Sequence, residues 1–125
     1  MPTQVAACVA RLGGPGGENA YHRLIEADDA IIPLLVDAFR REQDPAIRAQ
    51  LVEVIWQHRL LQTVDFLAEA LDDADPGVWK SALDGLVALG GPRARGVLKA
   101  ARQHADPERV VWIDEAIEQI EGSAE

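Results

Sequence analysis

The chain has almost no cysteine and no long apolar segment. Cys8 is the single cysteine among 125 residues, so no internal disulfide can form. No run of 18 apolar residues suggests a membrane-spanning helix, and the first residues lack the basic region and apolar stretch of a signal peptide. We therefore expect a protein of the reducing cytoplasm, in which Cys8 is a small core residue rather than a nucleophile.

Basic side chains are also scarce. Lysine and arginine total 12, whereas aspartate and glutamate total 21, which gives a formal net charge of −9. Proteins that bind DNA or RNA without regard to sequence draw their affinity from clustered lysine and arginine. The composition therefore argues against a nucleic-acid partner and favours a basic protein partner.

Motifs of catalysis and of ligand binding are missing from the sequence. His22, His58 and His104 do not form a His-Glu-x-x-His motif, and a single cysteine excludes Cys-x-x-Cys. The acidic run 72–75 is too short for a calcium loop. The glycine-rich segment 13–17 lacks the Gly-Lys-Ser/Thr ending of a phosphate-binding loop, so we interpret it as a flexible turn. We expect no catalytic residue, no metal and no cofactor.

What the sequence does contain is a constant interval between three Asp-Pro pairs. The pairs are Asp44-Pro45, Asp75-Pro76 and Asp106-Pro107, and both steps (44 to 75 and 75 to 106) span 31 positions, which we call the repeat interval. Aspartate caps the free N–H groups of a first helical turn, and proline suits the first position of a helix. Helices are therefore predicted to begin near 45, 76 and 107, with apolar residues every three or four positions behind each pair. A constant interval of this length is typical of stacked repeat proteins.

Other segments complete the fold prediction. Three of them also have helical periodicity, namely 31–42, 63–71 and 92–105. Residues 1–28 are predicted to form an irregular N-terminal cap, with helices over 5–12 and 18–26 on either side of the glycine-rich segment. We therefore predict one all-α domain over 1–125, in which the cap precedes three helix-pair repeats over 29–121. The expected architecture is a right-handed α-α superhelix of about four antiparallel helix pairs.

Two stretches resemble a known family, namely DPAIRAQLVEVI (44–55) and ALDDADPGVWKSALDGLVALGGPRA (70–94). They resemble the short bacterial HEAT-like repeats of the phycobilin lyase class, in which Val-Arg follows the aspartate and leads into an Ala/Leu-rich helix. Ile47-Arg48 keeps this pattern, whereas Trp79 and Val110 stand where arginine is usual. The resemblance covers about residues 29–121 and implies the fold, because the residues that the family shares are structural.

Two charged stripes are the first candidate binding site. The acidic members are Asp65, Glu69 and Asp72, and the basic members are Arg95, Lys99 and Arg102. Each stripe has i, i+4, i+7 spacing, and adding 30 to the number of each acidic member gives the number of a basic member. The stripes either pair with each other as a surface ladder, at about 0–1 kcal/mol for each pair, or form a bipolar groove that binds a partner.

Tryptophan is the second candidate feature, because it is enriched in interface hot spots. Trp56 and Trp112 lie beside apolar core positions, and we interpret both as packing residues at repeat junctions. For Trp79, packing and a role as a partner-binding anchor are both open.

These expectations leave two functions. The first is a non-enzymatic scaffold or adaptor that presents 31–42, 63–71 and 92–105 to another protein, for example an immunity-type inhibitor that covers a basic toxin. The second is implied by the resemblance and is a subunit related to the phycobilin lyases, which attach or detach a bilin. The first is preferred, because no ligand-handling residue is evident.

Overall fold

The computed structural model describes the backbone of residues 2–123 and the side chains of residues 4–122. This part of the chain contains α-helices and two short 3₁₀ helices, and no strand. The helices are α1 (Pro2–Arg11), α2 (Gly17–Glu26), η1 (Asp29–Ile31), α3 (Ile32–Arg41), α4 (Pro45–Gln57), η2 (Leu61–Thr63), α5 (Val64–Leu71), α6 (Pro76–Leu89), α7 (Gly91–Arg102) and α8 (Pro107–Ser123). The predicted domain 1–125 also includes Met1 and residues 124–125, which lie outside the described range.

The Asp-Pro pairs begin helices as predicted. α4, α6 and α8 each start at the proline of such a pair. The preceding aspartate accepts a hydrogen bond from a backbone N–H of the first turn in all three cases. These bonds run from Ala46 to Asp44 (2.9 Å), from Val78 to Asp75 (3.2 Å) and from Arg109 to Asp106 (2.9 Å). The carboxylates thus satisfy N–H groups that have no partner within their helix.

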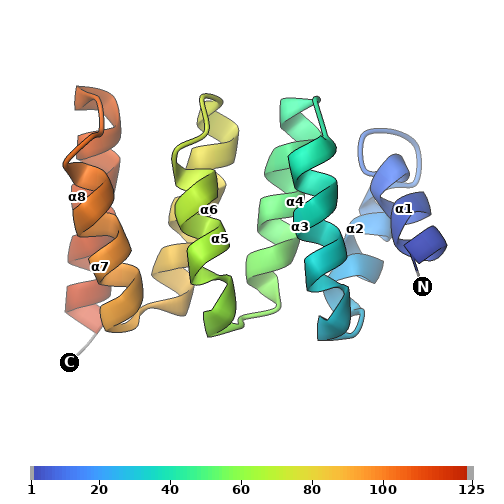
Figure 1. The fold of residues 1–125 in the computed structure, drawn as a ribbon, viewed down its shortest axis with the longest axis horizontal. Coiled ribbons are helices and arrows are strands. Elements are labelled where there is room, and N and C mark those ends of the chain that lie inside the picture. The colour runs from blue at the N-terminus through green and yellow to red at the C-terminus, as the bar shows by residue number, and fades with distance from the viewer. Residues whose placement is uncertain (1, 124–125) are drawn as a thin grey trace.

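The helices form two layers along the long axis of the array (Figure 1). One layer contains α1, α3, α5 and α7, and the other contains α2, α4, α6 and α8. The packed pairs are α1–α2, α3–α4, α5–α6 and α7–α8, each joined across the two layers. The structure is therefore an all-helical stack of helix pairs, and the right-handed sense of its superhelix stays a prediction. Among residues 2–123, no helix combines the length and apolar character that crossing a bilayer requires.

A continuous apolar core fills the space between the two layers. Equivalent positions of successive repeats contribute to it in the same way, as Leu51, Ala82 and Ile113 show, which are 0%, 0% and 1% exposed. These residues are separated by the repeat interval, and each lies on the buried side of an Asp-Pro helix. Residues equivalent by the sequence interval therefore have equivalent environments, as the repeat prediction requires.

The two layers are not packed equally tightly at the centre of the array. α4 and α6 share the most extensive contact of any helix pair in residues 2–123. α3 and α5 meet mainly through long side chains, such as the Phe39 and Phe66 rings at 5.1 Å between centroids. Gly85 permits the closer approach of α6 to α4, because a Cβ atom added there would lie 2.7 Å from both Cβ and Cγ of Trp56. We call α2, α4, α6 and α8 the inner layer and α1, α3, α5 and α7 the outer layer.

The N-terminal cap is joined to the repeats by a buried histidine. The side chain of His58, at the end of α4, is 2% exposed. Its Nδ1 atom lies 2.7 Å from a carboxylate oxygen of Asp29, and its Nε2 atom lies 2.9 Å from the carbonyl oxygen of Leu24 in α2. These two contacts of the His58 ring tie the α2–η1 segment to the first Asp-Pro helix.

Candidate protein-binding surface

The acidic stripe predicted from the sequence lies on α5 in the outer layer, and two of its members form ion pairs with neighbouring helices. Asp65 accepts from Arg93 at 2.8 Å, and Glu69 accepts from Arg40 of α3 at 2.7 Å. These pairs join residues 28 and 29 positions apart, which is three and two residues short of the repeat interval. The paired residues therefore do not occupy equivalent positions of successive outer helices. The predicted one-for-one pairing of the two stripes is wrong, although a ladder of ion pairs between repeats does exist.

The basic stripe lies on α7 and pairs with α8 instead of α5. Arg95 and Lys99 lie 3.7 Å and 3.6 Å from a carboxylate oxygen of Glu121. Arg102 donates two hydrogen bonds to Asp114, at 2.5 Å and 3.2 Å, and these bonds hold the pKa of Asp114 below its ordinary value. Every basic member of the stripe thus has an acidic partner on the next helix.

The remaining acidic member, Asp72, is exposed and caps the C-terminal end of α5. It forms no ion pair within the part of the chain whose side chains are described. A single exposed carboxylate at a helix end does not make a binding site. Most charges of the two stripes are therefore paired within the chain, which argues against the alternative of a bipolar groove that binds a partner.

The anchor interpretation of Trp79 is wrong. Its side chain is 2% exposed, because α8 covers it. The ring of Trp112 packs edge-on against it at 6.1 Å between centroids, and the guanidinium of Arg109 lies 5.1 Å from its centroid. Trp112, which we interpreted as a packing residue, does pack at this junction and is also 41% exposed. Packing is the role that the structure gives to Trp79.

Two arginines hold the turn between α5 and α6 from opposite sides. Arg109 donates to the carbonyl oxygens of Leu71 and Asp73, at 3.0 Å and 2.6 Å, and so satisfies the C-terminal end of α5. Arg48 of the preceding repeat donates to the Asp73 carboxylate at 2.5 Å and lies 4.2 Å from the centre of the Phe39 ring. The resemblance expects an arginine at position 110 of the third repeat, where the chain has valine. Arg109, one position earlier, supplies the structural arginine of this repeat.

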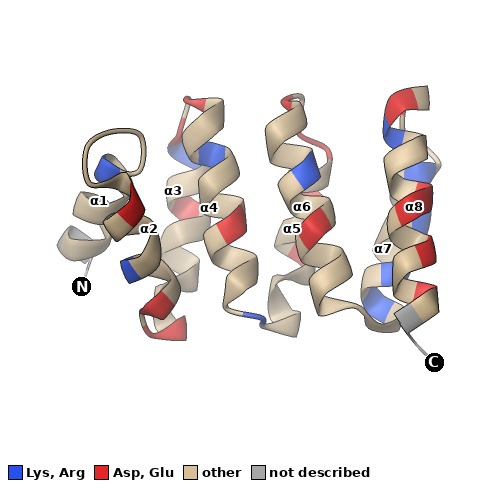
Figure 2. Ribbon diagram, turned by 180° about the vertical axis from the view of Figure 1, so that it is seen from behind, with Lys and Arg blue, Asp and Glu red and all other residues tan. Residues whose placement is uncertain are grey.

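A row of three carboxylates crosses the inner layer. Glu53, Asp84 and Glu115 occupy equivalent positions of α4, α6 and α8, separated by the repeat interval. Figure 2 shows acidic segments on these three helices at similar heights. Sequence reasoning missed this row, although the same interval that located the Asp-Pro pairs would have found it.

The inner carboxylates lack the ion pairs that neutralise the outer layer. Within the part of the chain with described side chains, neither Asp84 nor Glu115 has an ion-pair or hydrogen-bond partner. The Glu53 carboxylate accepts a hydrogen bond from the Tyr21 hydroxyl of α2. Burial and this hydrogen bond raise the pKa of Tyr21 to about 12, so the phenol remains a donor. We call Glu53, Asp84 and Glu115 the acidic row.

Two members of the row, Glu53 and Asp84, repel each other. Partial burial raises the pKa of Asp84 above its ordinary value, and repulsion from the Glu53 carboxylate raises it further. The Glu53 and Asp84 carboxylates therefore repel each other, and neither forms an ion pair with a described side chain. An external cation at this position would relieve this repulsion.

An exposed aromatic side chain and a lysine lie beside the row. Trp112 precedes Glu115 on α8, and the Nζ atom of Lys80 lies 4.3 Å from the centre of its ring. Trp112, Ser81 and Gln50 are again separated by the repeat interval, so they form a second line across the inner layer. The inner layer thus offers a surface of mixed character, with acidic, polar and aromatic groups in parallel lines.

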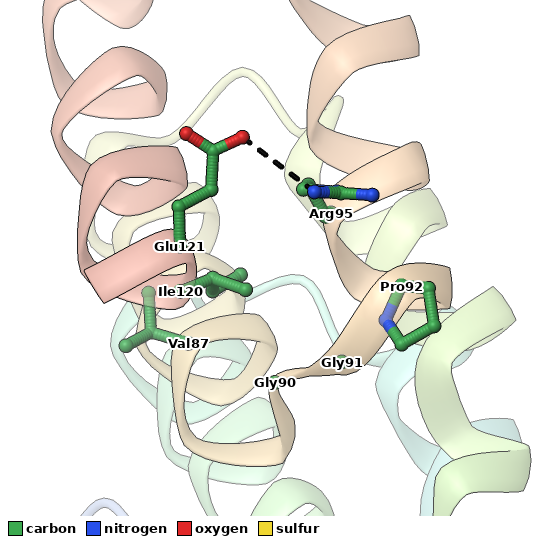
Figure 3. Close-up of a pocket in the computed structure, with 7 residues that line it drawn as sticks. All are labelled: Val87, Gly90, Gly91, Pro92, Arg95, Ile120 and Glu121. Carbon is green, nitrogen blue, oxygen red and sulfur yellow. Dashed lines mark ion pairs between the residues drawn. The ribbon is translucent and has the colours of Figure 1, made fainter. Parts of the chain in front are cut away.

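A pocket lies at the C-terminal end of the array, away from the acidic row. It has a volume of about 360 Å³ and is lined by Val87, Gly90, Gly91, Pro92, Arg95, Ile120 and Glu121 (Figure 3). Its two charged groups, Arg95 and Glu121, face each other across 3.7 Å and neutralise one another. Small-ligand sites need polar groups that converge on the ligand, and this pocket directs its charges at each other. Among the described residues, no group of three His, Cys, Asp or Glu side chains is placed to hold a metal.

The geometry defines an α-helical repeat protein, in which helix pairs of constant length stack through a shared apolar core. Comparison with known families agrees, because the family of HEAT repeats matches residues 32–118, which is more than half of the chain. The chain belongs to the HEAT-repeat family. No curated protein matches it. HEAT repeats commonly act as scaffolds for protein–protein interaction, through the extended surfaces that stacking creates.

Proposed function

We propose that the chain is a non-catalytic protein-binding module and that its inner layer holds the partner. One observation carries this proposal. The charges of the outer layer are largely neutralised by ion pairs within the chain, whereas the acidic row of the inner layer is not. Charged side chains that already form ion pairs within the chain contribute little to the binding of a partner. The acidic row, which has no such ion pairs, is therefore the better binding surface.

The partner that best suits this surface is a basic protein. The formal net charge of −9 attracts a basic partner at long range, and the acidic row gives it a defined place to bind. An inhibitor of the immunity type, which covers a basic toxin, is one concrete form of this proposal. The partner surface moves from α3, α5 and α7, where we first expected it, to α4, α6 and α8.

Site-specific photo-crosslinking in the source cells tests this proposal. A photoreactive amino acid is placed at Ser81 or Trp112 on the inner layer, and at Asp37 or Ala100 on the outer layer. We expect both inner positions to capture the same protein, which mass spectrometry identifies, and the outer positions to capture little of it. Capture from the outer positions alone, or from no position, would contradict the proposal.

A further inference from the structure

The acidic row has a spacing that favours one kind of partner segment. α4 packs directly on α6, and α6 packs directly on α8. Packed helices have axes about 8–10 Å apart, so successive carboxylates of the row are separated by about that distance. A ligand that neutralises all three must present cations about 10 Å apart on one face.

An α-helix meets this requirement when its cations are seven residues apart. Seven residues rise about 10.5 Å and complete nearly two turns, so positions i, i+7 and i+14 lie on one face. A β-strand does not meet it, because three residues span about 10 Å but place alternate side chains on opposite faces. We propose that the acidic row docks a basic α-helix of the partner protein, with lysine or arginine at every seventh position across Glu53, Asp84 and Glu115. This inference rests on the proposed function.

The surroundings of the row support a docked helix. Trp112 is exposed beside Glu115, and the adjacent Val111 is 65% exposed, so apolar side chains of the partner helix would gain contact there. Repulsion between Glu53 and Asp84 would fall once a cation lay between them, since this repulsion contributes to the raised pKa of Asp84. Lys80 is the basic residue beside the row, and its ammonium group is directed at the Trp112 ring. The face thus retains its acidic character.

Peptide binding tests the spacing. We would titrate the full chain into fluorescent helical peptides of about 20 residues on an alanine–glutamine background. One peptide carries lysine at every seventh position, and a second carries the same number of lysines at every fifth position, which spreads them around the helix. A third peptide is polyproline-based with lysine at every third position, because that helix repeats every three residues and about 9 Å.

Two triple variants locate the binding surface. Glu53→Gln, Asp84→Asn and Glu115→Gln neutralise the acidic row. Asp65→Asn, Glu69→Gln and Asp72→Asn remove the same charge from the outer layer. We expect the seventh-position peptide to bind most tightly, and the row variant to weaken this binding roughly tenfold. The outer variant should change it less than about threefold, and added salt should weaken it.

Four results would overturn the inference. They are equal binding of the first two peptides, tighter binding of the polyproline peptide, a larger effect of the outer variant, or no binding of the first peptide. If photo-crosslinking still captures a partner from Ser81 and Trp112, the proposed function stands and only the helical partner segment is wrong. Circular dichroism of both variants, with equal helix content expected, excludes unfolding as the cause of any lost binding.

Discussion

Adding one methyl group at Gly85 should destabilise the protein, although alanine is the better helix former. A Cβ atom at this position of α6 would lie 2.7 Å from Cβ and Cγ of Trp56, whereas carbon atoms in contact are normally about 3.5–4.0 Å apart. The Cβ atom of Trp56 cannot rotate away, because it is bonded to the backbone of α4. The two helices must therefore separate by roughly 1 Å.

The magnitude follows from two opposing effects. Overpacking costs about 1–3 kcal/mol, and we expect the upper part of this range because atoms close to both backbones collide. Replacing glycine by alanine in a helix returns about 1 kcal/mol. Gly85→Ala should therefore lower the free energy of unfolding by about 1–2 kcal/mol, as measured by urea denaturation with circular dichroism detection.

Gly96 of α7 supplies the matched control. A Cβ atom there would meet nothing within 4 Å, so only the helix propensity changes. Gly96→Ala should raise the free energy of unfolding by up to about 1 kcal/mol. Equal stabilisation by both substitutions would show that α4 and α6 are not in close contact.

Three further predictions concern single residues. Trp79→Ala should lower the free energy of unfolding by about 3–5 kcal/mol, because the side chain is buried. A nearly unchanged melting temperature would show that Trp79 is not a core residue. The raised pKa of Asp84 means that the folded state binds the carboxyl proton more tightly than the unfolded state does. Protonated Asp84 therefore stabilises the fold at low pH, and this stabilisation is lost as the pH rises through the folded pKa. The melting temperature of Asp84→Asn, measured relative to the parent protein, should therefore be higher at about pH 7 than at about pH 3. The same difference in melting temperature at both pH values would refute this. Arg59 has a positive φ of 58°, and the equivalent residue of the next repeat is Gly90, with a φ of 63°. Arg59→Gly should therefore raise the free energy of unfolding by about 1 kcal/mol in urea denaturation. A lower free energy of unfolding would mean that the Arg59 side chain stabilises the fold by more than its backbone conformation costs.

The features that the sequence predicted are local or periodic. A capping aspartate acts within its own first turn, so Asp44, Asp75 and Asp106 could be identified without knowledge of the tertiary structure. The buried faces of α4, α6 and α8 follow from the spacing of their apolar residues in the same way. The match of the chain to HEAT repeats over residues 32–118 agrees with this part of the prediction.

The features that the sequence did not predict depend on how neighbouring helices are placed. Which acid pairs with Arg93 or Arg40 is decided by where the neighbouring helices place each carboxylate, and no pattern within one helix reveals that placement. The exposure of Trp79 and Trp112 is decided by how α8 packs on α6, so the sequence alone left packing and partner binding both open for Trp79. The alignment of Trp112 with Ser81 at the repeat interval was a usable sign that Trp112 belongs to the inner layer.

Quantitative affinity capture from the source cells tests the central claim most directly. The parent protein, the acidic-row variant and the outer-layer variant are immobilised in equal amounts, and the retained proteins are compared by mass spectrometry. Both variants lose the same charge, so general attraction of basic proteins falls equally. We predict that one basic protein is retained by the parent and the outer-layer variant and is lost from the acidic-row variant. Equal retention by all three, or loss from the outer-layer variant alone, would contradict a binding role for the inner layer.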